Sequence, residues 1–207
     1  MERKRVGIVL FEDIEVLDFC GPFEVFSVTR LNEERRREEP SPFEVLLVVE
    51  SPGPVTTTGG MKVIPHSTFE HCPHLDIVVS PGGWGTRREL KNPIILNWLR
   101  ERAAEVETLT AVCTGSMLLG FAGLLDGLHA TTHWRSLDWM RESFPLVTVE
   151  YGKHVVQDGK VFTSAGISAG IDMSLKVVAH YFGEAIARAT ARHMEYSYPE
   201  SDARRVY

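Results

Sequence analysis

The sequence predicts an α/β fold, a doubly wound and mostly parallel sheet sandwiched by helices, in a single domain spanning residues 1–207. Short, almost wholly apolar runs recur along the chain, as expected for strands that are covered on both faces. Helical patterns alternate with these runs over the whole length, which is typical of doubly wound folds. We find no internal repeat, low-complexity tract or linker that would divide the chain into two domains.

The first unit of this pattern is a strand, a loop and a helix. Residues 6–11 form the apolar run, and residues 17–30 carry the helical pattern. The pair Gly21-Pro22 lies near the start of that helix, where a proline suits the first turn. Residues 30–42 are of mixed charge and end in prolines, so we expect a solvated helix end and loop without chemistry.

A second buried strand and a hairpin follow. Residues 43–50 are apolar, after which a proline- and glycine-rich break ends the strand. The pair Gly59-Gly60 separates residues 55–58 from residues 61–65, which predicts a small hairpin or a sharp strand bend.

The remaining elements continue the alternation. The expected strands are residues 76–80, 107–112, 130–132, 147–150 and 155–163, the last with a turn at Asp158-Gly159. The expected helices are residues 93–104, 114–123, 134–143, 167–182 and 184–198, with Gly183 between the last two.

Composition excludes several classes of protein. The chain has 22 Lys+Arg and 28 Asp+Glu, a formal net charge of −6, which argues against a general nucleic-acid binder. No segment approaches the roughly 18 apolar residues of a spanning helix, and the N-terminus lacks a signal-peptide cleavage site. Three cysteines in a chain of this size make a disulfide framework improbable. We therefore expect a cytoplasmic protein that does not interact with membranes.

Candidate site loops follow from the predicted fold, because doubly wound sheets bind ligands at the carboxyl ends of their strands. This rule selects the turn after residues 6–11, the glycine-rich turn at residues 81–85 and the junction at Cys113.

Cys113 lies where a buried strand turns directly into a helix, which is the arrangement of a nucleophile elbow. A thiol at a helix N-terminus feels the positive end of the helix dipole, so we expect a lowered pKa and a populated thiolate. The alternative interpretation is a small buried cysteine that packs a strand end.

Two further features surround this elbow. Backbone N–H groups of Gly82 and Gly83 are candidate oxyanion donors, since glycine turns bring N–H groups close to a growing negative charge. Asp18 lies in an otherwise apolar segment, so it is either a helix N-cap or a desolvated carboxyl with a raised pKa that transfers protons.

Other candidates carry weaker signals. Trp84 and Trp134 flank candidate loops and could line an apolar substrate pocket, or only pack. We expect Cys20 to pack against the core. One short segment is crowded with potential metal ligands, but their spacing fits no common zinc pattern and we predict no metal site: His66, His71, Cys72 and His74.

Taken together, these motifs resemble the ThiJ/PfpI superfamily, which has a flavodoxin-like, class I glutamine amidotransferase-like fold. The resemblance extends from about Val6 to Glu195 and rests on five segments in the same order: residues 17–26, residues 81–83, the Cys113 elbow, residues 130–134 and residues 163–172.

Within the superfamily, Asp18 combined with Cys113 and Thr114 resembles isonitrile hydratases and the amidase-like sensor domains of AraC-type regulators. Peptidase-like members have a histidine directly after the cysteine, where this chain has Thr114. No helix-turn-helix region follows Glu195, so we expect a stand-alone enzyme.

The resemblance implies a mechanism on a small electrophilic substrate without metal or organic cofactor. Cys113 would attack the terminal carbon of an isocyanide while Asp18 supplies the proton, which gives a thioimidate. Asp18 would then activate water, and an N-substituted formamide would leave. Thr114 would orient the thiolate or the water, and its N–H with that of Gly83 would hold the developing charge. The resemblance also implies a homodimer.

Several alternatives stay open. His133 either pairs with Cys113 as a base or orienting group, or caps the helix that starts at Trp134. The same elbow also fits a cysteine amidase or a glyoxalase-like hydratase of 2-oxoaldehydes. A different class is a non-catalytic ligand or redox sensor, in which Cys113 is oxidised to a sulfinic acid that Asp18 stabilises.

Overall fold

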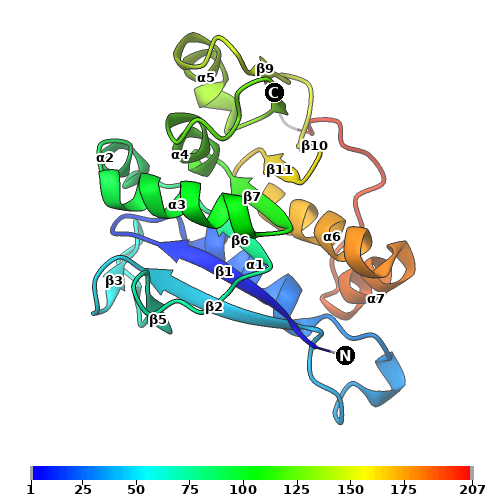
Figure 1. Cartoon of the computed structure of the whole chain (residues 1–207). Coiled ribbons are helices and arrows are strands. Elements are labelled where there is room, and N and C mark those ends of the chain that lie inside the picture. Colours follow the sequence, from blue (N-terminus) through cyan, green and yellow to red (C-terminus); the bar gives the residue numbers. More distant parts are fainter. Residues whose placement is uncertain (1, 206–207) are drawn as a thin grey trace.

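The computed structural model describes residues 2–205, and its centre is a seven-stranded sheet (Figure 1). All neighbouring strands are parallel except the edge pair β10 and β11, which is antiparallel. In order across the sheet, the strands are β10 (Val155–Asp158), β11 (Val161–Ser164), β7 (Thr108–Val112), β6 (Ile77–Ser80), β1 (Lys4–Leu10), β2 (Phe43–Val49) and β5 (Ser67–Thr68).

Helices cover both faces of this sheet, which confirms the predicted doubly wound fold (Figure 1). One face carries α1 (Val16–Val28), α6 (Ala169–Phe182) and α7 (Glu184–His193). The other face carries α3 (Pro93–Glu105) and α4 (Gly115–Phe121), with the short α2 (Thr86–Glu89) beside α4.

The central strands are largely buried, as their apolar sequences predict. Every residue of β6 and β7 is buried, and β1 pairs with β2 along its full length. Buried side chains from the strands and from both helical layers form one connected hydrophobic cluster. Burial of this apolar surface is the main stabilising contribution to the fold.

Two small sheets lie outside the main one. The predicted hairpin is confirmed as β3 (Val55–Thr56) and β4 (Lys62–Val63), whose connection includes Gly60 at φ 82°. The predicted short strand at residues 130–132 corresponds to β8 (His129–Ala130), which pairs in parallel with β9 (Thr148–Val149).

The predictions for three helices need correction. The expected helix 134–143 is two pieces, the 3₁₀ turn η2 (Trp134–Ser136) and α5 (Leu137–Ser143), because Ser136 leaves the helical backbone at φ −113° and ψ 3°. The expected helix 184–198 ends at His193, and Glu195 adopts a positive φ of 51°. Pro22 lies inside α1 instead of in its first turn, so it cannot donate a hydrogen bond to the carbonyl of Asp18.

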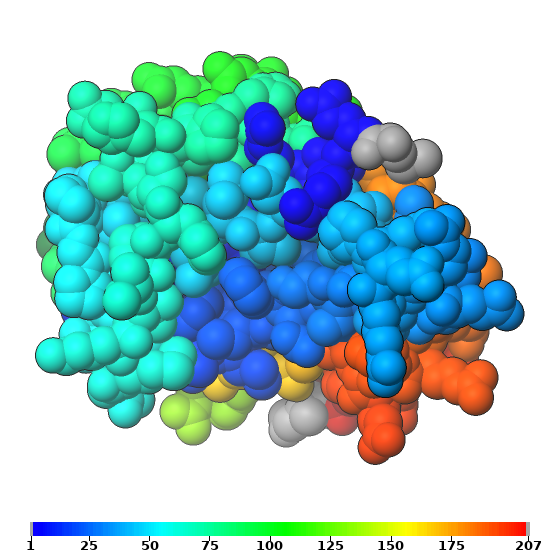
Figure 2. Space-filling model, turned by 90° about the horizontal axis from the view of Figure 1, so that it is seen from below, coloured from blue at the N-terminus to red at the C-terminus, as the bar shows by residue number. Residues whose placement is uncertain are grey.

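The mixed-charge segment after α1 is exposed, as predicted. It contains the short 3₁₀ turn η1 (Glu33–Arg35), where Arg36 pairs with Glu33 on the surface. Figure 2 shows this segment projecting beside α7, and Glu33 lines the same hollow as Arg192 and His193.

The order of the strands creates a switch point between β1 and β6. The chain passes from β1 to β2 on one side and returns to place β6 on the other side, next to β7. The carboxyl ends of β1, β6 and β7 therefore meet at one edge of the sheet, where such folds bind ligands.

Candidate active site

Cys113 occupies a sharp elbow between β7 and α4. Its backbone is in the left-handed region at φ 56°, which is strained for a residue with a side chain. Hydrogen bonds fix this conformation, since the N–H of Cys113 donates to the carbonyl of Ser164 at 3.2 Å and its own carbonyl accepts from the hydroxyl of Thr132 at 2.9 Å. The geometry agrees with the predicted elbow.

Gly115 permits the close approach of this elbow to the neighbouring strand. A Cβ atom at Gly115 would overlap the backbone carbonyl oxygen of Ser80, at the end of β6. Only glycine lets the first turn of α4 pack directly against β6.

The thiol of Cys113 is buried, with 6% of the residue exposed. Burial and the nearby carboxylate of Asp18 raise its pKa well above the usual range, while hydrogen bonds from Thr114 act in the opposite direction. The prediction of a lowered pKa is therefore wrong. Desolvation of the thiolate outweighs the favourable groups at the start of the short helix α4.

Asp18 lies in the first turn of α1 and is fully buried. The interpretation of Asp18 as an N-cap is wrong, because Glu15 occupies that position. The N–H of Gly82 donates to Oδ2 of Asp18 at 3.0 Å, and Oδ1 has no hydrogen-bond partner among residues 2–205. Burial raises the pKa of Asp18 to about 8, with a smaller contribution from Glu15, against the lowering effects of Gly82 and Cys113. The alternative interpretation, a desolvated carboxyl with a raised pKa, is confirmed.

The turn after β6 positions these groups. Gly82 fills the space between Asp18 and Thr114, because a Cβ atom there would lie 2.6 Å from the Thr114 backbone nitrogen and 2.9 Å from Oδ2 of Asp18. The N–H of Gly83 donates to the hydroxyl of Thr114 at 3.2 Å. Both N–H groups that we predicted as oxyanion donors are thus already bound to side chains of the site.

Thr114 connects the elbow to the turn after β6 and to α2. It is buried, and its hydroxyl lies 3.0 Å from the hydroxyl of Thr86 as well as accepting from Gly83. Its backbone and side-chain hydrogen bonds to the thiol of Cys113 favour the thiolate. Of the predicted donors, the N–H of Thr114 is the one that acts on the sulfur.

His133 caps η2 and also lines the pocket. Its Nδ1 accepts from the N–H of Arg135 at 3.3 Å, so the capping interpretation is confirmed. Burial and the positive charges of Arg135 and Arg204 lower its pKa, which keeps the imidazole neutral. Within the described chain it makes no hydrogen bond to Cys113.

Gly166 separates the imidazole of His133 from the thiol. A Cβ atom at Gly166 would lie 2.6 Å from Sγ of Cys113 and 2.9 Å from Cδ2 of His133. Gly166 was not among the predicted site residues, although it belongs to the segment 163–172 that carries the family resemblance.

A pocket of about 200 Å³ opens above Cys113. Trp84, 66% exposed, lines it as predicted, whereas Trp134 does not. Asp18 and Gly82 lie behind the thiol, outside the lining. The lining residues are Glu15, Gly83, Trp84, Arg87, Cys113, Thr114, His133, Arg135, Ser136 and Ile167. Sequence reasoning missed the remaining lining residues, because these residue types at these positions carry no motif of their own: Glu15, Arg87, Arg135, Ser136 and Ile167.

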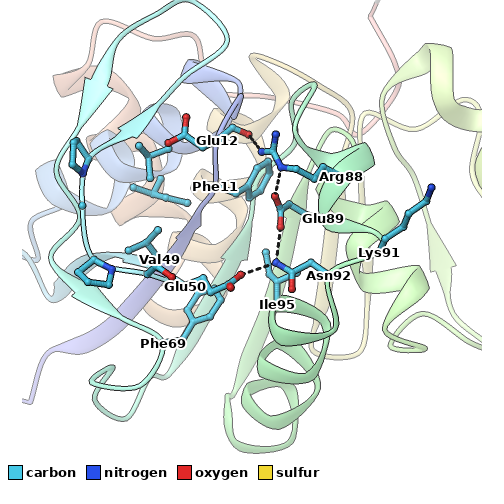
Figure 3. A pocket seen from close by; sticks show the side chains of 16 residues that line it. Phe11, Glu12, Val49, Glu50, Phe69, Arg88, Glu89, Lys91, Asn92 and Ile95 are labelled. Atoms are coloured by element: carbon cyan, nitrogen blue, oxygen red, sulfur yellow. Dashed lines mark hydrogen bonds and ion pairs between the residues drawn. The ribbon is translucent and has the colours of Figure 1, made fainter.

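A larger pocket, of about 560 Å³, lies beyond the carboxyl ends of β1 and β2 (Figure 3). Its polar side chains bind one another, since Glu89 accepts from Arg88 and Asn92, and Asn92 also donates to Glu50. The residues that line this pocket include no cysteine and no histidine, so we assign the chemistry to the smaller pocket.

The crowded His/Cys segment is dispersed by the fold. His66 accepts from the N–H of Leu47, whereas Nδ1 of His71 contacts the hydroxyl of Thr68. Among residues 2–205, no group of three or more His, Cys, Asp or Glu is arranged to hold a metal ion. Cys20 packs against the hydrophobic core, and all three cysteines are free thiols. None of the helices described is long and apolar enough to cross a membrane.

The fold and the site together define a doubly wound α/β protein with a buried cysteine at an elbow and a buried carboxyl beside it. The DJ-1/PfpI family matches residues 4–180, and the chain belongs to this family. The predicted resemblance to the ThiJ/PfpI superfamily is thereby confirmed.

The relatives of this chain include both an enzyme and transcriptional regulators. The chain is 35% identical over 193 residues to an isonitrile hydratase from Pseudomonas putida, covering 93% of this chain and 78% of that protein. It is 36% identical over 135 residues to the HTH-type transcriptional regulator CdhR from Pseudomonas aeruginosa, covering 65% of this chain and 40% of the regulator.

Solved structures show the same fold. A ThiJ/PfpI family protein from Pseudomonas syringae matches with a TM-score of 0.83 and 30% identity, covering 97% of this chain and 78% of that one. DJ-1beta from Drosophila melanogaster matches with a TM-score of 0.79 and 19% identity, covering 95% of this chain and all of that one, and this likeness shows the fold alone.

Proposed function

We propose that this chain hydrates a small isocyanide to an N-substituted formamide through a thioimidate on Cys113. The observation that carries the proposal is a buried carboxyl, Asp18, which interacts with a buried thiol directly beside a small pocket. The similarity to the Pseudomonas putida isonitrile hydratase supports this choice of reaction.

The first step uses the form of the site in which Asp18 and Cys113 share one proton. The sulfur forms a bond to the terminal isocyanide carbon, and the shared proton moves from Asp18 to the same carbon. The product is a thioimidate, with a carbon–nitrogen double bond, and an ionised Asp18. Because Oδ1 of Asp18 has no partner among the described residues, it is the oxygen available for this transfer.

Hydrolysis then returns the site to its starting form. The carboxylate of Asp18 takes a proton from water as the water oxygen adds to the thioimidate carbon, and it passes that proton to the substrate nitrogen. When the tetrahedral intermediate collapses, its hydroxyl proton moves to Asp18 and the carbon–sulfur bond breaks. The formamide leaves, and the pair again shares one proton.

Thr114 and His133 support these steps in different ways. The N–H of Thr114 stabilises negative charge on the sulfur when the thiolate forms and when it leaves. His133 stays neutral at the pocket wall and serves to position the substrate, since Asp18 already transfers the proton.

The decisive experiment compares Cys113→Ala with wild type on an alkyl isocyanide, with formamide measured by NMR. Turnover should disappear in Cys113→Ala and be retained in Cys72→Ala, a control in which another buried thiol is removed. Full activity of Cys113→Ala would overturn the proposal.

Two alternatives are tested by the same samples. Turnover of methylglyoxal without turnover of isocyanides would assign a glyoxalase-like activity. Oxygen addition at Cys113 under mild peroxide, with neither substrate consumed, would assign a redox sensor. The raised pKa of Cys113 disfavours the sensor, because the thiolate is the species that peroxide oxidises.

We also place this activity in the cytoplasm and in a homodimer. The three free thiols are consistent with a reducing compartment. The family resemblance supports the dimer, which a measured mass in solution of twice 23.2 kDa would establish.

A further inference from the structure

Two arginines stand at the pocket that contains Cys113, and the proposed chemistry uses neither of them. Arg87 comes from α2 and Arg135 from η2, and both are exposed. Glu15 is the one carboxylate among the residues that line this pocket.

Aromatic rings hold both guanidinium groups in place. Arg87 lies 4.7 Å from the ring centre of Trp84 and 5.9 Å from that of Trp139. Arg135 lies 4.7 Å from the ring centre of Trp134. Stacking occupies the face of a guanidinium and leaves the N–H groups at its edge available to an anion.

Neither guanidinium is neutralised by the protein. Across residues 2–205, no carboxylate lies within ion-pair distance of Arg87 or Arg135, whereas the neighbouring Arg88 pairs with Glu89 and Asp13. The two arginines therefore add uncompensated positive charge to the entrance of the pocket.

A second, more apolar hollow continues beyond these arginines. It has a volume of about 510 Å³ and shares Arg87, Arg135 and Ser136 with the pocket of Cys113. Phe121 and Trp139 contribute to its other walls. The two guanidinium groups thus stand between the thiol and a hollow with room for the rest of a substrate.

We propose that Arg87 and Arg135 form a carboxylate-binding subsite, and that the substrate is an isocyanide which carries a carboxylate. This inference rests on the proposed function for the identity of the reacting group. Charge-assisted hydrogen bonds from the two guanidinium groups hold the carboxylate. Glu15 repels it from its own side of the pocket, which orients the isocyanide carbon toward Cys113.

The test compares ω-isocyanocarboxylates of increasing chain length with their methyl esters. In the wild type, kcat/KM for the acid of best length should exceed that for its ester by about tenfold, and added salt should reduce the difference. Arg87→Gln and Arg135→Gln should each reduce the ratio of kcat/KM for the acid to kcat/KM for the ester by about three- to tenfold. Arg88→Gln, on the same short helix but already ion-paired, is the matched control and should leave the preference unchanged.

Equal turnover of acids and esters in the wild type would overturn the subsite and leave the proposed function standing. If no isocyanide is consumed, a binding measurement tests the carboxylate subsite separately from the proposed reaction. Calorimetry with Cys113→Ala should show that N-formylglycine binds more tightly than its methyl ester. This preference should be smaller when Arg87→Gln or Arg135→Gln is combined with Cys113→Ala. Equal binding of the acid and the ester would overturn the subsite whatever the reaction.

Discussion

The carboxyl of Asp18 and the thiol of Cys113 both lose contact with water in the same small space. Each is disfavoured in its charged form by burial, and each charge would also oppose the other. The two groups therefore titrate as a pair, with apparent pKa values that belong to the pair. In the proposed mechanism, the form of the pair with one proton is the reactive one, and it is reached when the first proton is lost.

The pH dependence of catalysis follows from this coupling. We expect kcat/KM for an isocyanide to rise with pH with a midpoint near 8, the pKa to which burial raises Asp18, and to fall again when the second proton leaves. A pH profile of initial rates measures this. A rate that does not change through pH 8 would show that the pair does not control the reaction.

The same burial carries a cost in stability. The ordinary Asp pKa is 3.8, so between that pH and about 8 the unfolded chain is ionised at position 18 while the folded protein keeps its proton. The unfolded state binds fewer protons in this range, and the free energy of unfolding falls as pH rises.

Asp18→Asn removes this cost. The variant should be about as stable as wild type near pH 4 and more stable by on the order of a few kcal/mol at pH 8, because the amide is neutral and still accepts from Gly82. Urea unfolding at the two pH values measures the difference, and isocyanide turnover should be lost. Equal stability at pH 8 would contradict the raised pKa.

At the scale of elements, the site depends on the close approach of the turn after β6 to the elbow after β7 and to the start of α4. Gly82 leaves space for Asp18 and Thr114, and Gly115 lets α4 pack against the end of β6. These contacts bring the turn after β6 and the elbow after β7 close together.

Gly115→Ala should therefore reduce stability by about 1–3 kcal/mol, since the added methyl group meets backbone that has little freedom to move. The midpoint temperature of thermal unfolding and kcat should both decrease. Gly59→Ala, in a hairpin turn with open space around it, is the matched control. A Gly115→Ala protein as stable as wild type would show that α4 shifts easily.

The central strands and the elbow were predictable from sequence for a physical reason. A strand covered on both faces needs a continuous apolar run such as residues 76–80 or 107–112, and a cysteine at its carboxyl end stands out. The raised pKa of Cys113 was not predictable, because it depends on burial in the folded protein and on the charge of Asp18, which comes from a distant part of the chain. The roles of Gly82 and Gly83 likewise depend on which acceptors the fold brings to their N–H groups.

At the scale of the whole molecule, the segment after α7 returns to the site. Arg204 is buried, and its guanidinium donates to the hydroxyl of Thr131 at 2.8 Å and to the carbonyl of Thr132 at 3.1 Å. Thr132 in turn donates to the carbonyl of Cys113. The C-terminal segment is thus connected to the elbow by two consecutive contacts.

Arg204→Met should reduce both stability and kcat, because it leaves buried oxygen atoms of Thr131 and Thr132 without these donors. We expect a loss of about 1–3 kcal/mol in the free energy of unfolding. Arg188→Met, which removes exposed ion pairs with Glu184 and Glu200 and an exposed contact with the Tyr198 ring, should change stability by less than about 1 kcal/mol. Denaturant unfolding compares the two, and equal losses would contradict the role of Arg204.

Part of the pocket wall comes from a later stretch of the chain than the residues of the proposed chemistry. Asp18, Gly82, Cys113 and Thr114 all precede residue 115, whereas His133, Arg135, Ser136 and Ile167 come from later loops. Loops accept substitutions more readily than the scaffold that holds them. Mutations at Arg135, Ser136 or Ile167 can therefore change which molecules fit while the pair of Asp18 and Cys113 stays intact, so new substrates can be reached in evolution without rebuilding the reactive centre.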